Sequence, residues 1–116
     1  MARILVVDDE ERMRHLLSLM LKRKGYEVQQ SKDGLEAFRM LQERAFDLII
    51  TDIRMPRLDG HGLLDRMKEQ GIDCPVIFIT AFASVESAVE AMKQGVVDYI
   101  SKPFEEDRIL FTVERT

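Results

Sequence analysis

Short runs of apolar residues alternate along the chain with segments in which apolar residues recur every three or four positions. Three runs, residues 4–7, 48–50 and 76–79, are continuous and rich in β-branched residues. Strands that are buried on both faces of a parallel sheet have this composition. Two weaker runs, residues 26–28 and 96–100, are each interrupted by an acidic residue. The pattern therefore predicts five short strands.

Helical spacing fills the intervals between these runs. We expect each apolar stripe to form the buried face of a helix. The two longest stripes are Met13, Leu16, Leu17, Met20 and Leu21, and then Val85, Ala88, Val89 and Met92. Shorter stripes within residues 37–41, 63–67 and 110–113 predict three more helices, and the last of these should begin near Glu105.

Residues typical of helix ends agree with this division. Three glycines each follow a helical segment and precede a strand, where a left-handed cap strains any other residue: Gly25, Gly71 and Gly95. Asp33 and Glu36 have the spacing of a capping box, and Ser84 is a candidate N-cap. Strands and helices thus alternate throughout. This order predicts an α/β fold, a doubly wound parallel sheet with helices on both faces.

Length and composition narrow the class of protein. The 116 residues allow one domain, and 46 % hydrophobic with 33 % charged residues is ordinary for a soluble globular chain. No apolar stretch approaches the ~20 residues that span a bilayer, so we expect no membrane contact. The net charge of −4 argues against nucleic-acid binding by this domain itself. A single cysteine, Cys74, fits a cytoplasmic location.

Polar side chains follow the predicted strands at the point where each strand ends. Asp8 and Asp9 end the first strand, Asp52 the third, Thr80 the fourth, and Lys102 follows the fifth. The carboxyl ends of parallel strands share one edge, and ligands bind there where the strand order reverses. If the order is the flavodoxin-like 2-1-3-4-5, the first and third strands are neighbours, and these side chains meet in one pocket.

The charges of that pocket indicate its ligand. Three carboxylates and one ammonium sum to −2, and clustered carboxylates repel one another unless a cation intervenes. Donors that are all oxygen favour a hard cation, Mg²⁺ or its substitute Mn²⁺, over zinc. A cation site beside a lysine and a threonine suits phosphoryl transfer, in which one carboxylate can serve as the nucleophile.

At these positions the chain resembles the receiver domain of bacterial two-component response regulators. The resemblance covers essentially the whole chain and rests on residues 6–10, 50–56, 59–60, 79–81 and 98–104. It implies a five-stranded, flavodoxin-like (βα)5 domain with strand order 2-1-3-4-5. The segments of residues 82–92 and 98–104 look most like receivers of enhancer-binding, sigma-54-dependent transcription activators.

The resemblance implies a role for each polar residue. Asp52 accepts a phosphoryl group from a sensor histidine kinase. Asp9, Asp52 and the backbone carbonyl of Arg54 bind Mg²⁺, and Asp8 assists through water. In this family the phosphoryl oxygens are held by a lysine, a hydroxyl and a backbone N–H, which correspond here to Lys102, Thr80 and Ala81. Tyr99 corresponds to the family's aromatic switch residue. The peptide bond before Pro103 is usually cis in this family. The domain is not an enzyme in the usual sense, because it catalyses only its own phosphoryl transfer and slow dephosphorylation.

The resemblance also implies a surface that moves on phosphorylation, formed by the fourth helix, fifth strand and fifth helix within residues 84–116. That surface commonly forms a homodimer or meets an effector. We expect residues 1–116 to be a receiver domain from a longer regulator of transcription. A stand-alone receiver and a phosphorylation-independent protein-binding domain are the alternatives.

Two other α/β classes fit the residues less well. Haloacid-dehalogenase-type phosphatases need a second acid two positions after the nucleophile, and here that position is Arg54. Flavodoxin-like cofactor binders need a first loop that holds phosphate, whereas residues 8–11 are all acidic.

Overall fold

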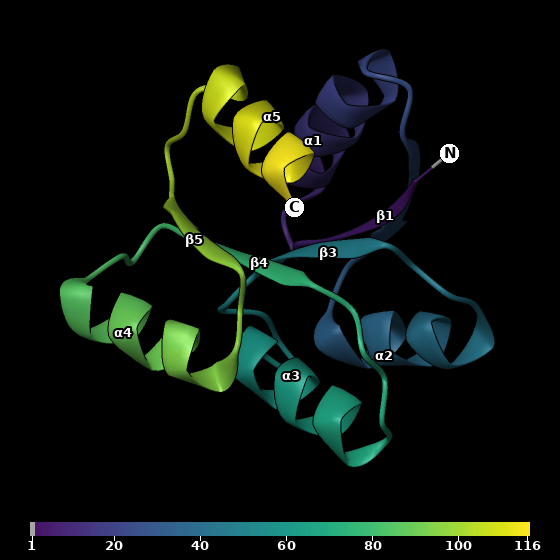
Figure 1. The fold of residues 1–116 in the computed structure, drawn as a ribbon, viewed down its shortest axis with the longest axis vertical. Helices are drawn as coiled ribbons and strands as arrows, with labels where there is room; N and C mark the ends of the chain where they lie inside the picture. Colours follow the sequence, from purple (N-terminus) through teal and green to yellow (C-terminus); the bar gives the residue numbers. More distant parts are fainter. Residues whose placement is uncertain (1) are drawn as a thin grey trace.

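In the computed structural model, which describes residues 2–116, five parallel strands form one sheet between two layers of helices (Figure 1). The strands are β1 (Arg3–Val7), β2 (Glu27–Ser31), β3 (Leu48–Asp52), β4 (Val76–Thr80) and β5 (Asp98–Ser101). The helices are α1 (Glu11–Arg23), α2 (Gly34–Glu43), α3 (Gly60–Glu69), α4 (Val85–Gln94) and α5 (Glu106–Arg115). The predicted alternation of strands and helices is confirmed, although the two weaker strands begin slightly later than their apolar runs.

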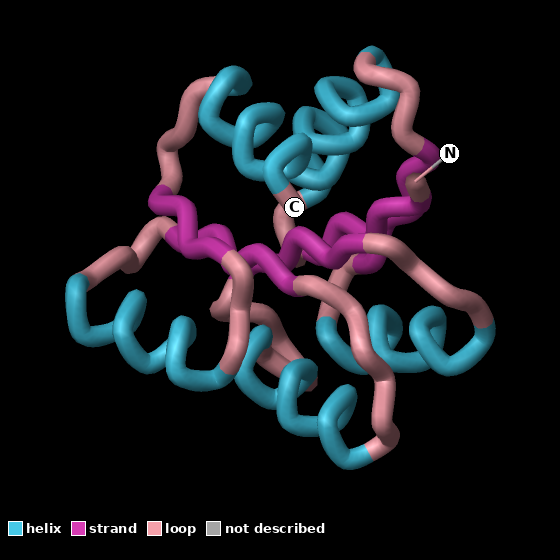
Figure 2. Tube along the Cα trace, viewed as in Figure 1, coloured by secondary structure: helices cyan, strands magenta, loops and turns pink. Residues whose placement is uncertain are grey.

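The strand order is β2-β1-β3-β4-β5, so the order reverses between β1 and β3, as predicted. Val7 lies opposite Thr51 in the register of these two strands. The residues that follow this pair, Asp8 just after β1 and Asp52 at the end of β3, therefore lie at the same level of the sheet. Figure 2 shows α1 and α5 on one face of the sheet and α2, α3 and α4 on the other.

The core has two parts because both faces of the sheet are covered. Alternate residues of β1 enter different clusters, Leu5 and Val7 on one face and Ile4 and Val6 on the other. All four side chains are buried. This is the reason why the central strands are continuous apolar runs with no polar alternation. Among the described residues, no helix has both the length and the apolar character needed to cross a membrane.

The predicted helix ends are confirmed. Gly25, Gly71 and Gly95 all have positive φ angles. The side chain of Ser84 accepts a hydrogen bond from the Ser87 N–H at the start of α4. The capping box at α2 is only half formed. Asp33 accepts from the Glu36 N–H at 2.8 Å, but the Glu36 carboxylate accepts from Lys32 instead of Asp33.

The apolar stripe of α4 does not face the core, contrary to our expectation. Val85 is 80 % exposed, and Val89 and Met92 are about half exposed, whereas the buried residue of the helix is Ala91. In α1, Leu16 is also exposed. The helical period identifies an apolar stripe, but Ala91, which lies outside that stripe, is the residue of α4 that packs into the core.

Candidate functional site

The predicted acidic residues converge at the carboxyl edge of the sheet. Asp8 and Asp9 follow β1, Asp52 ends β3, and one carboxylate oxygen of each lies within 4.8 Å of the other two. The adjacency of β1 and β3 brings together residues that are more than forty positions apart in the sequence. Asp8 is buried, Asp52 is partly buried and Asp9 is exposed, so the cluster extends from the sheet to the surface.

Lys102 enters this cluster from the far end of the chain. Its Nζ donates to Asp8 Oδ2 at 2.9 Å and to Asp52 Oδ2 at 3.1 Å. Its backbone N–H donates to the Thr80 carbonyl at 2.7 Å, which fixes the lysine beside the end of β4. Burial acts to lower the pKa of Lys102, but the two carboxylates outweigh it and raise that pKa. The side chain is therefore an ammonium ion at neutral pH.

One lysine does not fully balance the carboxylates. The pKa of Asp52 lies above its ordinary value, first because burial removes water from the carboxylate, and also because of the charge of Asp8. Lys102 opposes this shift without cancelling it. A donor set made of carboxylate oxygens alone, with uncompensated negative charge, fits a hard divalent cation such as Mg²⁺. Asp8, Asp9 and Asp52 are the side chains that would hold it.

Asp8 is held more firmly than its neighbours. Its Oδ1 accepts from the Glu10 N–H at 2.9 Å, and its backbone carbonyl accepts from the guanidinium of Arg14 at 2.7 Å. Its other oxygen is the one that accepts from Lys102. Arg14 was not identified from the sequence, because nothing in its local pattern indicates that it reaches back to the end of β1.

The loops after β3 and β4 form the other wall of the site. Thr80 Oγ1 accepts from the Phe82 N–H at 3.0 Å. The Arg54 guanidinium lies 4.0 Å from the centre of the Phe82 ring, so the two loops are joined by a cation–π contact. The predicted positions of Arg54, Thr80 and Ala81 at this edge are thus reproduced, and the peptide bond between Lys102 and Pro103 is cis, as expected.

Tyr99 lies on β5, half-buried, and its hydroxyl donates to Ser87 Oγ on α4 at 2.9 Å. Ser87 was not identified from the sequence as its partner, because a serine within a helix is most often simply solvated. The bond nevertheless connects the predicted switch residue to the helix that carries the exposed apolar stripe.

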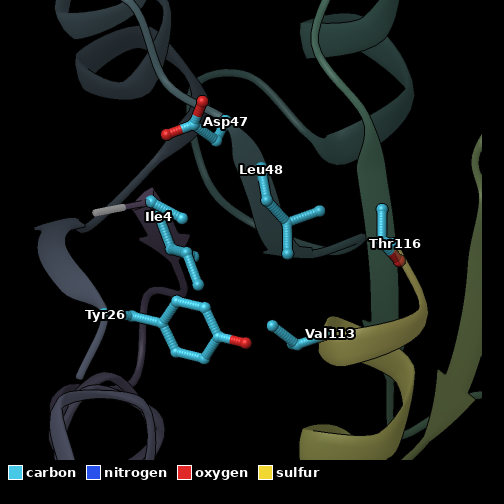
Figure 3. A pocket seen from close by; sticks show the side chains of 7 residues that line it. Ile4, Tyr26, Asp47, Leu48, Val113 and Thr116 are labelled. Atoms are coloured by element: carbon cyan, nitrogen blue, oxygen red, sulfur yellow. The ribbon is translucent and has the colours of Figure 1, made fainter. Parts of the chain in front are cut away.

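A second hollow lies at the opposite, amino edge of the sheet (Figure 3). This cavity of about 430 Å³ is lined by residues near the starts of the strands and the end of α5, among them Ile4, Tyr26, Leu48 and Val113. Its one carboxylate, that of Asp47, already accepts from the Arg3 N–H at 2.7 Å. Among the described residues that line the cavity, no cluster of charged groups is present that could perform chemistry.

Comparisons with known proteins agree with this geometry. Residues 4–114 match the family described as the response regulator receiver domain. Regulatory protein AtoC of Escherichia coli is 40 % identical over 97 % of the chain, and transcriptional regulatory protein FixJ of Bradyrhizobium diazoefficiens is 40 % identical over 96 %. The structure of the Francisella response regulator 1452 receiver domain superposes with a TM-score of 0.94 at 32 % identity, covering 99 % of this chain and 95 % of that one.

The chain is shorter than these regulators. The match spans 24 % of the length of AtoC and 54 % of that of FixJ. The similarity is therefore to one part of each regulator.

Proposed function

Because the chain belongs to the response regulator receiver domain family, we propose that it is a switch that is set by phosphorylation of Asp52. One observation carries this proposal. Lys102 Nζ and the carboxylates of Asp8 and Asp9 all gather around Asp52 at the carboxyl edge of the sheet. This set provides a nucleophile, a fixed positive charge and donors for a cation in one place.

The proposed reaction is a direct phosphoryl transfer. A carboxylate oxygen of Asp52 forms a bond to phosphorus while the bond from phosphorus to the donor breaks. The donor is a phosphohistidine of a sensor histidine kinase, and the imidazole nitrogen leaves with the electron pair. Lys102 already lies 3.1 Å from Asp52 Oδ2 and pairs with the incoming phosphoryl oxygens. The Thr80 hydroxyl and the Ala81 N–H donate to another of these oxygens.

Mg²⁺ would be held by Asp9, Asp52 and the Arg54 backbone carbonyl, with Asp8 assisting through water. When bound, the ion neutralises the charge that develops on the phosphoryl oxygens. The raised pKa of Asp52 and the oxygen-only donor set support this assignment. Mn²⁺ has the same preference for oxygen donors and should substitute.

The output side of the proposed switch is α4, β5 and α5. The Thr80 hydroxyl now accepts from the Phe82 N–H, and its own hydrogen donates to a phosphoryl oxygen when Thr80 moves towards the phosphate. Tyr99 then shifts, and its bond to Ser87 transmits the change to α4. Phosphorylation thus favours one of two accessible arrangements. The exposed Val85, Val89 and Met92 of α4 offer an apolar surface for a second copy of the domain or for an effector.

We further propose that the domain controls transcription through another part of a longer protein, as in enhancer-binding activators. The length of AtoC and the description of FixJ as a transcriptional regulatory protein support this step. The domain itself, with its net charge of −4, contacts no nucleic acid in this proposal.

Intact mass after incubation with acetyl phosphate tests the chemistry. We expect one phosphoryl group on the wild-type chain in the presence of Mg²⁺ and none when EDTA replaces the ion. Asp52→Asn should remain unmodified. Asp47→Asn, which removes an acid at the opposite edge, is the matched control and should be modified like the wild type.

A modified Asp52→Asn chain would contradict the assignment of the phosphoacceptor. No modification of the wild type by acetyl phosphate or by a cognate kinase would favour a phosphorylation-independent binding domain.

A further inference from the structure

The loop between β3 and α3, residues 53–59, begins directly after Asp52 and has an unusual backbone at its tip. Among residues 2–116, Arg57 is the one non-glycine residue with a positive φ angle, 72°. The Leu58 N–H donates across it to the Pro56 carbonyl at 2.8 Å, which makes a tight three-residue turn. A side chain larger than hydrogen is strained in this conformation, so its presence there calls for a compensating contact.

The Arg57 side chain makes that contact with the start of α2. Its Nη2 lies 3.1 Å from Asp33 Oδ2, and the Asp33 side chain is buried. The other oxygen of Asp33 accepts the Glu36 N–H and caps α2. The buried Asp33 carboxylate therefore binds both the first turn of α2 and Arg57, which lies more than twenty positions later in the sequence.

A second contact holds the same loop to the same helix end. The Gly34 N–H donates to the Leu58 carbonyl at 3.1 Å. A β-carbon at position 34 would lie 2.2 Å from that carbonyl oxygen, so only glycine permits this approach. We refer to the two contacts, Arg57 with Asp33 and Leu58 with Gly34, as the loop clip.

Other contacts of the loop lie along its length: Met55 and Leu58 pack against the hydrophobic core, and Asp59 caps α3. Two backbone bonds hold its base. The Ile53 N–H donates to the Ile79 carbonyl of β4 at 3.3 Å, and the Gly60 N–H donates to the Ile53 carbonyl at 2.7 Å. The base is therefore tied to the sheet, and the clip ties the tip to α2. Arg54 lies between these two anchors, and its exposed side chain lies against the Phe82 ring.

We propose that Asp33, Gly34 and Arg57 are positioning residues for the cation site. By fixing the tip of the loop on α2, they fix the direction of the Arg54 carbonyl relative to the carboxylate of Asp52. None of the three touches the proposed cation. This inference rests on the proposed function, because it assigns the loop a purpose only if the carbonyl of Arg54 binds the ion.

The variant Arg57→Ala separates positioning from simple electrostatics. Removing a positive charge near the site should strengthen Mg²⁺ binding if charge alone matters. If Arg57 positions the loop, the affinity should instead fall by about 10-fold, the lower end of what loss of an outer-shell partner costs. The measurement is Mg²⁺ binding to the whole chain by isothermal titration calorimetry.

Two further variants separate positioning from folding. Arg57→Gly removes the ion pair but suits the positive φ angle, so Mg²⁺ affinity should fall while the urea midpoint of unfolding stays or rises. Asp33→Asn keeps a capping side chain and loses the charge partner, and should also weaken binding. The double variant Asp33→Asn with Arg57→Ala should bind no more weakly than the weaker single variant, because both remove the same contact.

A readout without metal completes the test. In the metal-free chain, the Gly34 amide should exchange its hydrogen faster in Arg57→Ala than in the wild type, since the bond to Leu58 opens more often. The control is Arg3→Ala, which breaks the ion pair with Glu27 at the opposite edge and should alter neither readout.

Unchanged or tighter Mg²⁺ binding by Arg57→Ala, with normal binding by the wild type, would overturn the positioning role alone. Absence of Mg²⁺ binding by the wild type would overturn the proposed cation site and the positioning role with it.

Discussion

The two edges of the sheet differ in both shape and chemistry. The amino edge holds the cavity of about 430 Å³ beside Ile4 and Tyr26, lined largely by apolar side chains. The carboxyl edge brings three carboxylates within 4.8 Å of one another, with Lys102 bonded to two of them. In this fold, the proposed site of chemistry is marked by the convergence of charged groups from several strand ends more than by the size of a hollow.

The edges also differ in what they contribute to stability. The side chains of β1 near the amino edge are buried among apolar neighbours, which favours folding. At the carboxyl edge, the raised pKa of Asp52 shows that its charged form is disfavoured in the folded chain. The proposed cation site is therefore maintained at some expense of stability, as is common at functional sites.

Truncating the core near the amino edge should have the largest effect. Ile4→Ala removes a fully buried side chain, and we expect the free energy of unfolding to fall by about 2–5 kcal/mol through lost burial and a residual cavity. Urea unfolding measures this loss. Mg²⁺ affinity should stay within about twofold of the wild type, since distant sites act independently. A large loss of affinity in a still-folded variant would show that the two edges are coupled.

Neutralising an exposed acid at the carboxyl edge should lower the Mg²⁺ affinity and leave the free energy of unfolding almost unchanged. Asp9→Asn should weaken Mg²⁺ binding by roughly 10- to 100-fold, because one charged oxygen donor is lost from the cluster. The free energy of unfolding without metal should change by less than about 0.5 kcal/mol, as for other exposed residues. Calorimetric titration measures the Mg²⁺ affinity, and urea unfolding measures the free energy of unfolding. Full retention of affinity would remove Asp9 from the proposed ligand set.

Neutralising Asp52 should stabilise the chain, by less than truncation of Ile4 destabilises it. In Asp52→Asn without metal, we expect the free energy of unfolding at neutral pH to rise, because the variant removes a buried charge and its repulsion by Asp8. The folded-state pKa of Asp52 lies above the ordinary 3.8, so the folded chain binds this proton more tightly. The gain in free energy of unfolding of Asp52→Asn over the wild type is therefore largest above the folded-state pKa of Asp52.

That advantage should shrink as pH falls through the folded-state pKa and vanish below about 3.8, where Asp52 is protonated in both states. Urea unfolding of both chains across this pH range checks the sign. A variant less stable than the wild type at neutral pH would show that the bond between Asp52 and Lys102 outweighs the burial of the charge.

Local features of the sequence predicted most of the fold. The three continuous apolar runs became β1, β3 and β4, because a strand covered on both faces has little choice of composition. Gly25 and Gly95 could be predicted as helix ends because few other residues adopt a positive φ angle. Ser84 could be predicted as a cap because few side chains accept a hydrogen bond from the first turn of a helix. The outward direction of the α4 stripe could not be predicted, because a helical period has no information about which neighbour the helix meets.

The candidate site was predictable in its members but not in its contacts. Asp8, Asp52 and Lys102 could be chosen because each follows a predicted strand and matches the receiver pattern. The bonds of Tyr99 to Ser87 and of Arg57 to Asp33 could not, since each joins two elements whose approach depends on how helices pack on the sheet.

The elements of this chain, their ends and the types of residue at the carboxyl ends of the strands could therefore be read from the sequence, because they depend on short-range periodicity and backbone preference. Which groups touch depends on the folded domain. The pairing of β1 with β3 sets Asp8 level with Asp52, and the return of the chain through β5 brings Lys102 onto both carboxylates. Such distances are set by the packing of the whole domain, to which every strand and helix contributes.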